Sequence, residues 1–533
     1  MQEQNKSSFF DPKTIFAVVL VAAVWFGWQT YLTKKYPNYN KPAQKTATKE
    51  AAKTATPDAA AAAPATVEAQ STPTQGQITE KEYQFQDQNI TFTITNHGMG
   101  LKNVVLNKYI DYEKKPILLG QSETDTLFEM KLLSQQKPLE FDLKEEAPGQ
   151  YVGVAQVGTS TVTRTLKYDS EKQAFTNKVV VENPNEQVAQ GLTFVVPEKI
   201  TVPQSTSWLF PSYQHQDFFV KHNGKTETVN FSAAKENVAK QFPSVSLVSV
   251  SSQYFAAAIL DKSEIIPETS VTASPEGKTA KAELIYKPAA NLPKFSLEQI
   301  FFAGPKNIET LKHVDAELPA VIDHGFFEVI ARPLLYVMKA CFSMVGNWGI
   351  AIILLTLLVR FCVLPFAIMS AKSMKAMQKI QPLLQNLREK YKNDPMALNR
   401  ETMALMKEHK ANPLGGCLPM LLQIPIFFAL YRVIGSSIEL YHSPFYGWIT
   451  DLSSPDKFFV LPILVGLTMF LQQKMTPTTM DPAQAKIMAF LPLVFTLFML
   501  QLPSGLALYM TVSAVFGIVQ QYFFLKDSKK VTA

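Results

Sequence analysis

A series of long apolar runs dominates this 533-residue chain from Trp348 onward, and only a few compact charged loops interrupt it. Apolar runs of about 20 residues are long enough to cross a bilayer as helices. Five segments of this kind are predicted here, at residues 349–369, 414–433, 458–472, 487–500 and 506–524. The pattern predicts a polytopic α-helical membrane protein.

Residues 15–32 form a sixth apolar run, with Trp25, Trp28 and Tyr31 near its far end, where amphipathic rings favour the membrane interface. A cleavable signal peptide is the alternative interpretation. Such a peptide ends in small residues, whereas this run continues into aromatic residues and then two lysines. We therefore expect residues 1–33 to form an uncleaved N-terminal anchor.

The charged loops predict the orientation of the spans. The loop at residues 370–413 carries nine Lys and Arg against four Asp and Glu, whereas the loop at residues 435–457 carries a single Lys against three acidic residues. Short loops rich in Lys and Arg stay in the cytoplasm. We expect the basic loop and both termini, including a tail at 526–533, to be cytoplasmic, and the large polar region to be periplasmic. The three cysteines lie in or beside apolar segments, so no disulfide framework is expected.

The polar region contains two kinds of sequence. Residues 34–77 are rich in small and polar residues and lack the large apolar side chains that offset chain entropy, which predicts a disordered linker. Residues 78–318 show short alternating runs, such as Ile90, Phe92 and Ile94, separated by turn signals such as that at residues 275–278. This second pattern predicts one large all-β sandwich domain.

Residues 319–346 mix apolar residues with Glu328, Arg332 and Lys339, and we expect Pro333 to interrupt any regular helix. The segment is too charged to span a membrane comfortably. We expect an amphipathic helix that lies on the outer surface of the membrane that the spans cross. A helix that packs against a neighbouring domain is the alternative.

One charge is placed deep within the predicted spans, at Arg360 in segment 347–369. An arginine at the centre of a membrane helix costs roughly 2.5 to 3.5 kcal/mol on insertion scales. The five spans contain no Asp or Glu to pair with it, so we expect a hydrated cavity that faces the bundle interior. Snorkelling towards the interface is the alternative. Other polar residues of the spans fit such a cavity, although each could bond within its own helix: Thr356, Gln423, Gln472, Thr496, Gln501, Tyr509, Thr511 and Ser513.

The spans lack the residues that intramembrane chemistry requires. No acidic residue is present for a proton relay, no Ser/His or Asp pair for proteolysis, and no His/Cys spacing for a metal. We therefore expect no enzymatic activity and no cofactor. Two of the segments, 458–472 and 487–500, are shorter than the roughly 20 residues that a bilayer requires, which predicts local thinning of the membrane.

The basic loop at 370–413 predicts two antiparallel helices, because apolar residues recur there at helical spacing and Asp394 with Pro395 resembles a helix cap and first turn. Methionine is flexible and polarisable, which suits contact with varied apolar chains. Four methionines are candidate contacts: Met374, Met377, Met403 and Met406. An ordinary hairpin core is the alternative. The remaining spans, three to six, are expected within residues 414–525.

Several short motifs resemble the YidC membrane insertase family in its Gram-negative form. They are Asn412-Pro413-Leu414-Gly415-Gly416-Cys417-Leu418-Pro419, Gln423-Ile424-Pro425-Ile426-Phe427, Gln473-Lys474-Met475-Thr476-Pro477 and Leu502-Pro503-Ser504-Gly505-Leu506. Together with the six-span layout and the β domain, this resemblance extends over essentially the whole chain.

The resemblance implies a periplasmic β-super-sandwich and a five-helix core that encloses a hydrophilic groove open to the cytoplasm and to lipid. It implies groove residues Arg360, Thr356, Gln423 and Tyr509, and a client-contacting slide on the third and fifth spans with Phe427, Phe428 and Met499. The implied partners are nascent membrane proteins, membrane lipids, the Sec translocon with its accessory subunits, and the ribosome. No nucleic-acid recognition is expected.

Two other classes of function would also use parts of this layout. A transporter of ions or small molecules requires a polar cavity, but it predicts internal repeats and discontinuous helices, and no such repeat is seen in the sequence. A scaffold whose β domain binds sugars or partner proteins predicts that residues 78–318 are indispensable. A sandwich fold by itself does not decide between these classes.

Overall fold

The computed structural model describes residues 80–201, 215–232, 234, 236–289, 292–322, 327–392, 394–409, 418–475 and 482–530. The expected anchor at 1–33 and linker at 34–77 lie outside the described residues, as do residues 412–417 and 476–477 of the sequence motifs. Residues Ile78–Met369 and Cys417–Ala533 belong to one compact unit, and Ser370–Gly416 belongs to another. Each unit is described separately.

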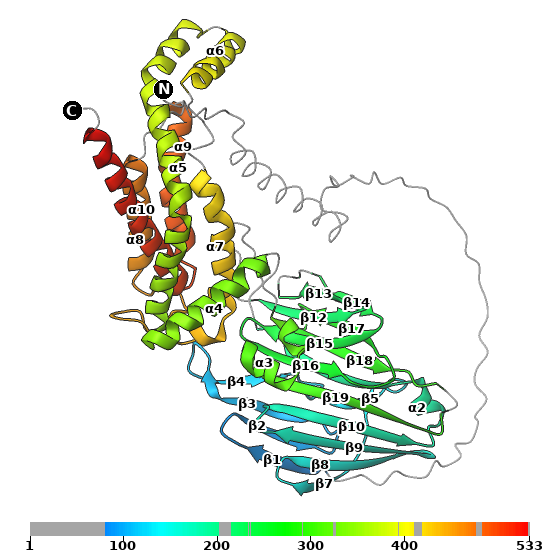
Figure 1. The fold of residues 1–533 in the computed structure, drawn as a ribbon. Helices are drawn as coiled ribbons and strands as arrows, with labels where there is room; N and C mark the ends of the chain where they lie inside the picture. Colours follow the sequence, from blue (N-terminus) through cyan, green and yellow to red (C-terminus); the bar gives the residue numbers. More distant parts are fainter. Residues whose placement is uncertain are drawn as a thin grey trace, which may run out of the picture. The chain divides into compact units, whose positions relative to one another are not determined.

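The first unit contains a β domain of three sheets (Figure 1), in which every pairing of neighbouring strands is antiparallel. The nine-stranded sheet consists, in spatial order, of β13 (Lys225–Asn230), β12 (Gln216–His222), β15 (Val245–Ser252), β16 (Phe255–Asp261), β19 (Lys294–Pro305), β10 (Ala174–Glu182), β9 (Ser160–Asp169), β8 (Gln150–Val157) and β7 (Asp142–Ala147). The six-stranded sheet consists of β14 (Val238–Phe242), β17 (Glu268–Ser274), β18 (Thr279–Tyr286), β11 (Leu192–Lys199), β5 (Met130–Leu132) and β6 (Lys137–Pro138). The four-stranded sheet consists of β1 (Glu82–Gln86), β2 (Ile90–Thr95), β3 (Leu101–Ile110) and β4 (Pro116–Leu119).

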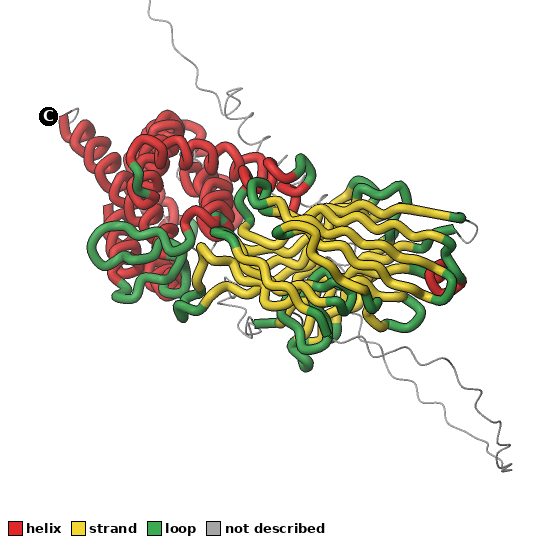
Figure 2. Tube along the Cα trace, turned by 90° about the horizontal axis from the view of Figure 1, so that it is seen from below, coloured by secondary structure: helices red, strands yellow, loops and turns green. Residues whose placement is uncertain are grey.

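Aromatic side chains join the inner faces of these sheets into one core. Phe194 of β11 lies 5.7 Å, centroid to centroid, from Phe301 of β19, and Phe92 of β2 lies 5.1 Å from Phe175 of β10. Side chains alternate between buried and more exposed along β9, as expected for a strand with one face on the core. The strands run side by side with loops at their ends (Figure 2). The predicted all-β super-sandwich is confirmed.

Short helices follow or interrupt the β domain. They are α2 (Glu186–Gln190), α3 (Ile308–Val314) and the 3-10 turn η1 (Leu318–Val321). The helix α4 (Glu328–Val345) comes next and ends at Gly346, whose φ of 66° is the left-handed conformation that glycine adopts readily. The prediction that Pro333 interrupts a regular helix is wrong. Pro333 lies near the start of α4, where its missing N–H removes only one early hydrogen bond of the helix.

Five apolar helices follow: α5 (Trp348–Lys390), α7 (Leu418–Ser436), α8 (Val460–Met475), α9 (Pro482–Met499) and α10 (Ser504–Lys530). Within the described residues, Trp348–Met377 and Ser504–Phe523 are long and apolar enough to cross a membrane, and shorter apolar stretches lie at Leu421–Ser436, Val460–Met475 and Ala489–Met499. Buried side chains of α5, α7, α8 and α10 pack with α4 into one apolar core. The expected number of six spans stays a prediction.

The loop between α7 and α8, which contains the 3-10 turn η4 (Ile438–Leu440), contacts the end of β3. The hydroxyl of Tyr441 donates to the carbonyl of Ile110 at 2.7 Å, and Nε2 of His442 lies 3.0 Å from the same oxygen. Nearby, Nε2 of Gln253 donates to the carbonyl of Gly435 at 2.6 Å. These contacts join the helices to the β domain within one unit.

The second unit contains the part of α5 after Ser370 together with α6 (Pro395–Glu408). The Asp394 carboxylate caps α6 by accepting from the Ala397 backbone N–H at 3.0 Å, and Pro395 follows it, as predicted. A small apolar cluster of Met377, Ile380 and Leu384 packs against α6. The basic loop therefore forms a helical hairpin with its own core.

Candidate functional site

Arg360 lies within the apolar part of α5 and reaches across to α10. Its Nε donates to the Ser513 hydroxyl oxygen at 2.8 Å, and its Nη2 donates to the same oxygen. The Arg360 side chain is partly exposed, whereas Ser513 is only 2% exposed. A neutral hydroxyl satisfies two of the guanidinium N–H groups without cancelling its charge.

Tyr509 lies one helical turn before Ser513 on α10 and is only 1% exposed. Its hydroxyl accepts a hydrogen bond from Nε2 of Gln423, a partly exposed side chain of α7. The structure therefore brings Arg360, Gln423 and Tyr509 together, and polar side chains connect three different helices. This polar cluster is defined here as Arg360, Gln423, Tyr509 and Ser513.

The start of α10 explains why its polar face meets α5 and α7. The Ser504 hydroxyl donates to the carbonyl of Ser454 at 2.7 Å, and the Gly505 N–H donates to the carbonyl of Leu452 at 2.9 Å. A Cβ atom at Gly505 would lie 3.2 Å from the Leu452 carbonyl oxygen and 3.3 Å from Ile352 of α5. The glycine therefore allows α10 to pack closely at this end.

Thr356, a predicted groove residue, is buried in this structure, and its role in the groove stays a prediction. Its side chain is fully buried, and its hydroxyl donates to the carbonyl of Ile352 in the same helix at 2.6 Å. Threonine in an apolar helix commonly satisfies its hydroxyl in this way. Thr356 lies one turn from Arg360, but it packs into the bundle core.

The three expected slide residues lie in different environments. Phe428 of α7 is exposed and stacks on Phe327 at 5.6 Å, and Phe427 is partly buried and lies 6.4 Å from Phe495 of α9. Met499, at the end of α9, is fully buried in the core. The structure therefore gives Phe428 an outward surface, whereas burial favours a packing role for Met499.

The four methionines predicted as hairpin contacts differ in how far they are buried. Met377 is buried, Met374 and Met406 are partly buried, and Met403 is 62% exposed. Met396, which the sequence did not single out, is 85% exposed.

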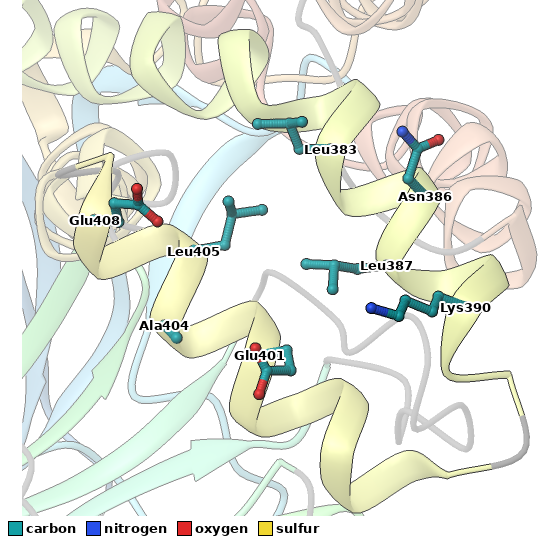
Figure 3. A pocket seen from close by; sticks show the side chains of 8 residues that line it. All are labelled: Leu383, Asn386, Leu387, Lys390, Glu401, Ala404, Leu405 and Glu408. Atoms are coloured by element: carbon teal, nitrogen blue, oxygen red, sulfur yellow. The ribbon is translucent and has the colours of Figure 1, made fainter.

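A cavity of about 310 Å³ lies between the two helices of the hairpin (Figure 3). Lys390 from α5 and Glu401 from α6 project into this space, and its apolar floor includes Leu387 and Leu405. Leucine side chains and opposite charges therefore face the same space in the hairpin.

Ser513 is the member of the polar cluster that no sequence motif distinguishes from the other polar residues of the spans. Only its spacing of four from Tyr509 places both residues on one face of a helix. Among the described residues, no group of three or more His, Cys, Asp or Glu is arranged to hold a metal ion.

Family models match both the helical part and the β domain of the chain. Residues 340–531 match the family model described as 60Kd inner membrane protein, and residues 82–337 match the model described as YidC periplasmic domain.

A membrane protein insertase YidC from Syntrophus aciditrophicus (strain SB) is 34% identical to the chain and covers 97% of it and 100% of its own length. Another from Geobacter sp. (strain M21) is 52% identical over 231 residues, which is 43% of each chain. The crystal structure of an active YidC insertase with its first transmembrane domain resolved shares 18% identity, covers 84% of this chain and 93% of its own, and has a TM-score of 0.39. Because a relative above 30% identity is matched along its whole length, the chain belongs to the YidC membrane protein insertase family.

Proposed function

We propose that this chain is a membrane protein insertase and chaperone of the bacterial inner membrane, with no enzymatic activity. It receives the hydrophilic part of a client beside Arg360 and releases the apolar part into lipid. The observation that carries the proposal is the uncancelled charge of Arg360, whose contact is the neutral hydroxyl of Ser513. Within the described residues, no carboxylate forms an ion pair with this guanidinium.

The charge provides an attraction for hydrophilic segments that lipid disfavours. Moving an unpaired polar group from water into an apolar medium costs roughly 2 to 7 kcal/mol. A hydrated, positively charged groove open to the cytoplasm and to lipid reduces this penalty, because water and the guanidinium remain available to the client. Acidic or polar tails gain most, since opposite charges attract more strongly where the dielectric constant is low.

The apolar part of the client then moves past α7 and α9 into the bilayer. Exposed apolar side chains on these helices support this route, among them Leu421, Ile424 and Phe428 on α7, and Phe490 and Leu493 on α9. Burial of apolar surface at about 25 cal/mol per Å² supplies the driving force, so this chain needs no nucleotide. Local thinning beside α8 and α9 would shorten the path further.

The remaining parts of the proposal concern topology and partners. Both termini and the hairpin are cytoplasmic, and six spans including the N-terminal anchor hold the β domain in the periplasm. The hairpin contacts emerging clients through its methionines, and the exposure of Met403 supports this role. The chain acts alone or beside the Sec translocon, and the same basic hairpin also faces the ribosome.

The test compares Arg360→Ala and Arg360→Lys in insertion of a client with an acidic translocated tail. Purified full-length protein is reconstituted in proteoliposomes, and the protease-protected fraction of the client tail is measured. We expect Arg360→Ala to reduce insertion, whereas Arg360→Lys largely retains total insertion because the positive charge that attracts the acidic tail remains, although the planar fork of donors is lost.

Arg432→Ala serves as the matched control, because Arg432 is an exposed arginine near the end of α7. It is expected to insert the client as the unmodified protein does. Equal insertion by Arg360→Ala and the unmodified protein would contradict the proposal. Site-specific crosslinking of a stalled nascent chain to Phe428 tests the proposed route in the same preparation.

A further inference from the structure

Two donor atoms of Arg360, Nε and Nη2, point at the single hydroxyl oxygen of Ser513. We propose that Ser513 is a positioning residue, which holds the side edge of the Arg360 guanidinium and turns its end towards a carboxylate or carbonyl group of the client. This inference rests on the proposed function of Arg360. It adds the residue that orients the charge and the edge of the guanidinium that receives the client.

The geometry of the guanidinium defines which edge remains for the client. Arginine carries five N–H groups in a planar fork, and a carboxylate is recognised by two parallel N–H groups on one edge. Ser513 accepts from the edge formed by Nε and Nη2. The edge formed by Nη1 and Nη2 therefore remains for an incoming acceptor, which approaches along the end of the side chain.

Ser513 lies on a part of α10 that packs closely against a neighbouring helix. Ser513 is buried, and Tyr509 and Gly517 lie one turn before it and one turn after it on α10. A Cβ atom at Gly517 would lie 2.8 Å from Nε2 of Gln472 on α8, so α10 packs closely against that helix. An arginine side chain held by a fixed partner loses less conformational freedom when it binds a client.

The chemistry of serine suits this role better than that of an acidic residue. A hydroxyl accepts two hydrogen bonds without neutralising the guanidinium, whereas an aspartate would form an ion pair and compete with an acidic client. The arrangement also opposes snorkelling, because the contact to α10 holds the side chain across the bundle. Ser513 therefore leaves the full positive charge available to the client.

The experiment measures a preference rather than total activity. Two clients that differ only by Asp or Asn in the translocated tail are inserted into proteoliposomes by the full-length protein. The ratio of their insertion rates reports how well Arg360 receives a carboxylate. Ser513→Ala is expected to lower this ratio by about tenfold, which corresponds to one hydrogen bond to a charged group. Ser513→Thr is expected to restore it, because threonine keeps the hydroxyl.

Two further variants separate positioning from packing. Ser513→Asp is expected to abolish the preference for the acidic tail, because the aspartate neutralises Arg360. Ser436→Ala serves as the control, because the Ser436 hydroxyl donates only to the carbonyl of Arg432 in its own helix, and it is expected to keep the original ratio.

The outcomes separate this inference from the proposed function. An unchanged ratio in Ser513→Ala, together with a reduced ratio in Arg360→Ala, would overturn the role of Ser513 alone. Equal losses for both clients in Ser513→Ala and Ser513→Thr would indicate helix packing and would also overturn it. An unchanged ratio and rate in Arg360→Ala would instead remove the proposed function itself.

Discussion

Nε of Arg164 donates to the Oδ1 atom of Asn177 at 2.7 Å inside the β domain, where both side chains are fully buried. Arg164 also donates to the carbonyl of Gly98 at 2.5 Å and to that of Phe128 at 2.9 Å. Arg164 lies in β9, Gly98 follows β2, and Phe128 precedes β5. One buried side chain therefore connects parts of all three sheets.

Replacing Arg164 is expected to destabilise the β domain strongly. Arg164→Met leaves the buried Phe128 carbonyl and the Asn177 side-chain oxygen without a donor and leaves the Gly98 carbonyl with only the Met130 backbone N–H, and we expect a loss of about 3 to 5 kcal/mol in the free energy of unfolding. Pulse proteolysis of the full-length protein in detergent measures this loss. Lys167→Met, at an exposed position of the same strand, is the control and should change stability little. A similar small effect of both variants would contradict the connecting role of Arg164.

A buried ionic cluster of Lys131, Glu129 and Asp125 predicts that acid destabilises the β domain. Nζ of Lys131 lies 2.7 Å from Oε1 of Glu129 and also pairs with Asp125. Burial raises the pKa of the Asp125 carboxyl, but the hydrogen bond and charge of Lys131 lower that pKa by more, so it lies below its usual value. The Asp125 carboxylate therefore stabilises the fold at pH values above the ordinary aspartate pKa of about 4. This stabilisation is lost as the pH falls through the lower pKa that Asp125 has in the folded protein.

Lys131→Met should be less stable than the unmodified protein by about 3 to 5 kcal/mol at neutral pH, because two buried carboxylates lose their cation. The difference should shrink as the pH falls from neutral towards about 4, because a buried carboxylate that has lost its cation takes up a proton more readily than an exposed one. Unfolding midpoints measured from pH 3 to pH 7 check both statements. Lys144→Met, which removes an exposed ion pair, is the control. Parallel pH profiles for the Lys131 variant and the unmodified protein would rule out this role.

The burial of Thr356 predicts that its hydroxyl does not contact clients. Thr356→Val keeps the shape of the side chain and removes a hydroxyl that bonds only within α5. Insertion of an acidic-tailed client should remain within about twofold of the unmodified protein, because a back-bonded hydroxyl contributes at most a few tenths of a kcal/mol. The proteoliposome assay used for Arg360 measures this rate. A loss of insertion rate as large as that of Arg360→Ala would show that the Thr356 hydroxyl contributes to client binding and would contradict this prediction.

The hairpin methionines should separate into contact and packing residues. Met403→Ala should weaken crosslinking of the hairpin to nascent chains without destabilising it, because Met403 is exposed. Met377→Ala should instead destabilise the hairpin by about 2 to 5 kcal/mol, because it leaves a cavity in the small apolar core. Crosslinking yield and limited proteolysis of the two variants test this division. Equal crosslinking by Met403→Ala and the unmodified protein would argue against a contact at this position.

Local patterns in the sequence are sufficient to predict the kinds of structure in this protein. Alternation of apolar residues predicts the β domain, and long apolar runs predict the helices, because each pattern reflects the repeat of a single element. The cap of α6 by Asp394 also depends only on neighbouring residues. The depth of Arg360 within an apolar run is a property of the sequence as well.

The tertiary structure decides which of these elements meet and which faces they bury. Ser513 becomes the partner of Arg360 only because α10 packs beside α5, although 153 residues separate the two in the chain. The same packing buries Thr356 and Met499 and leaves Phe428 exposed. Periodicity shows that a helix has an apolar face, but the partner of each face depends on contacts between distant segments, and those contacts are made only in the folded chain.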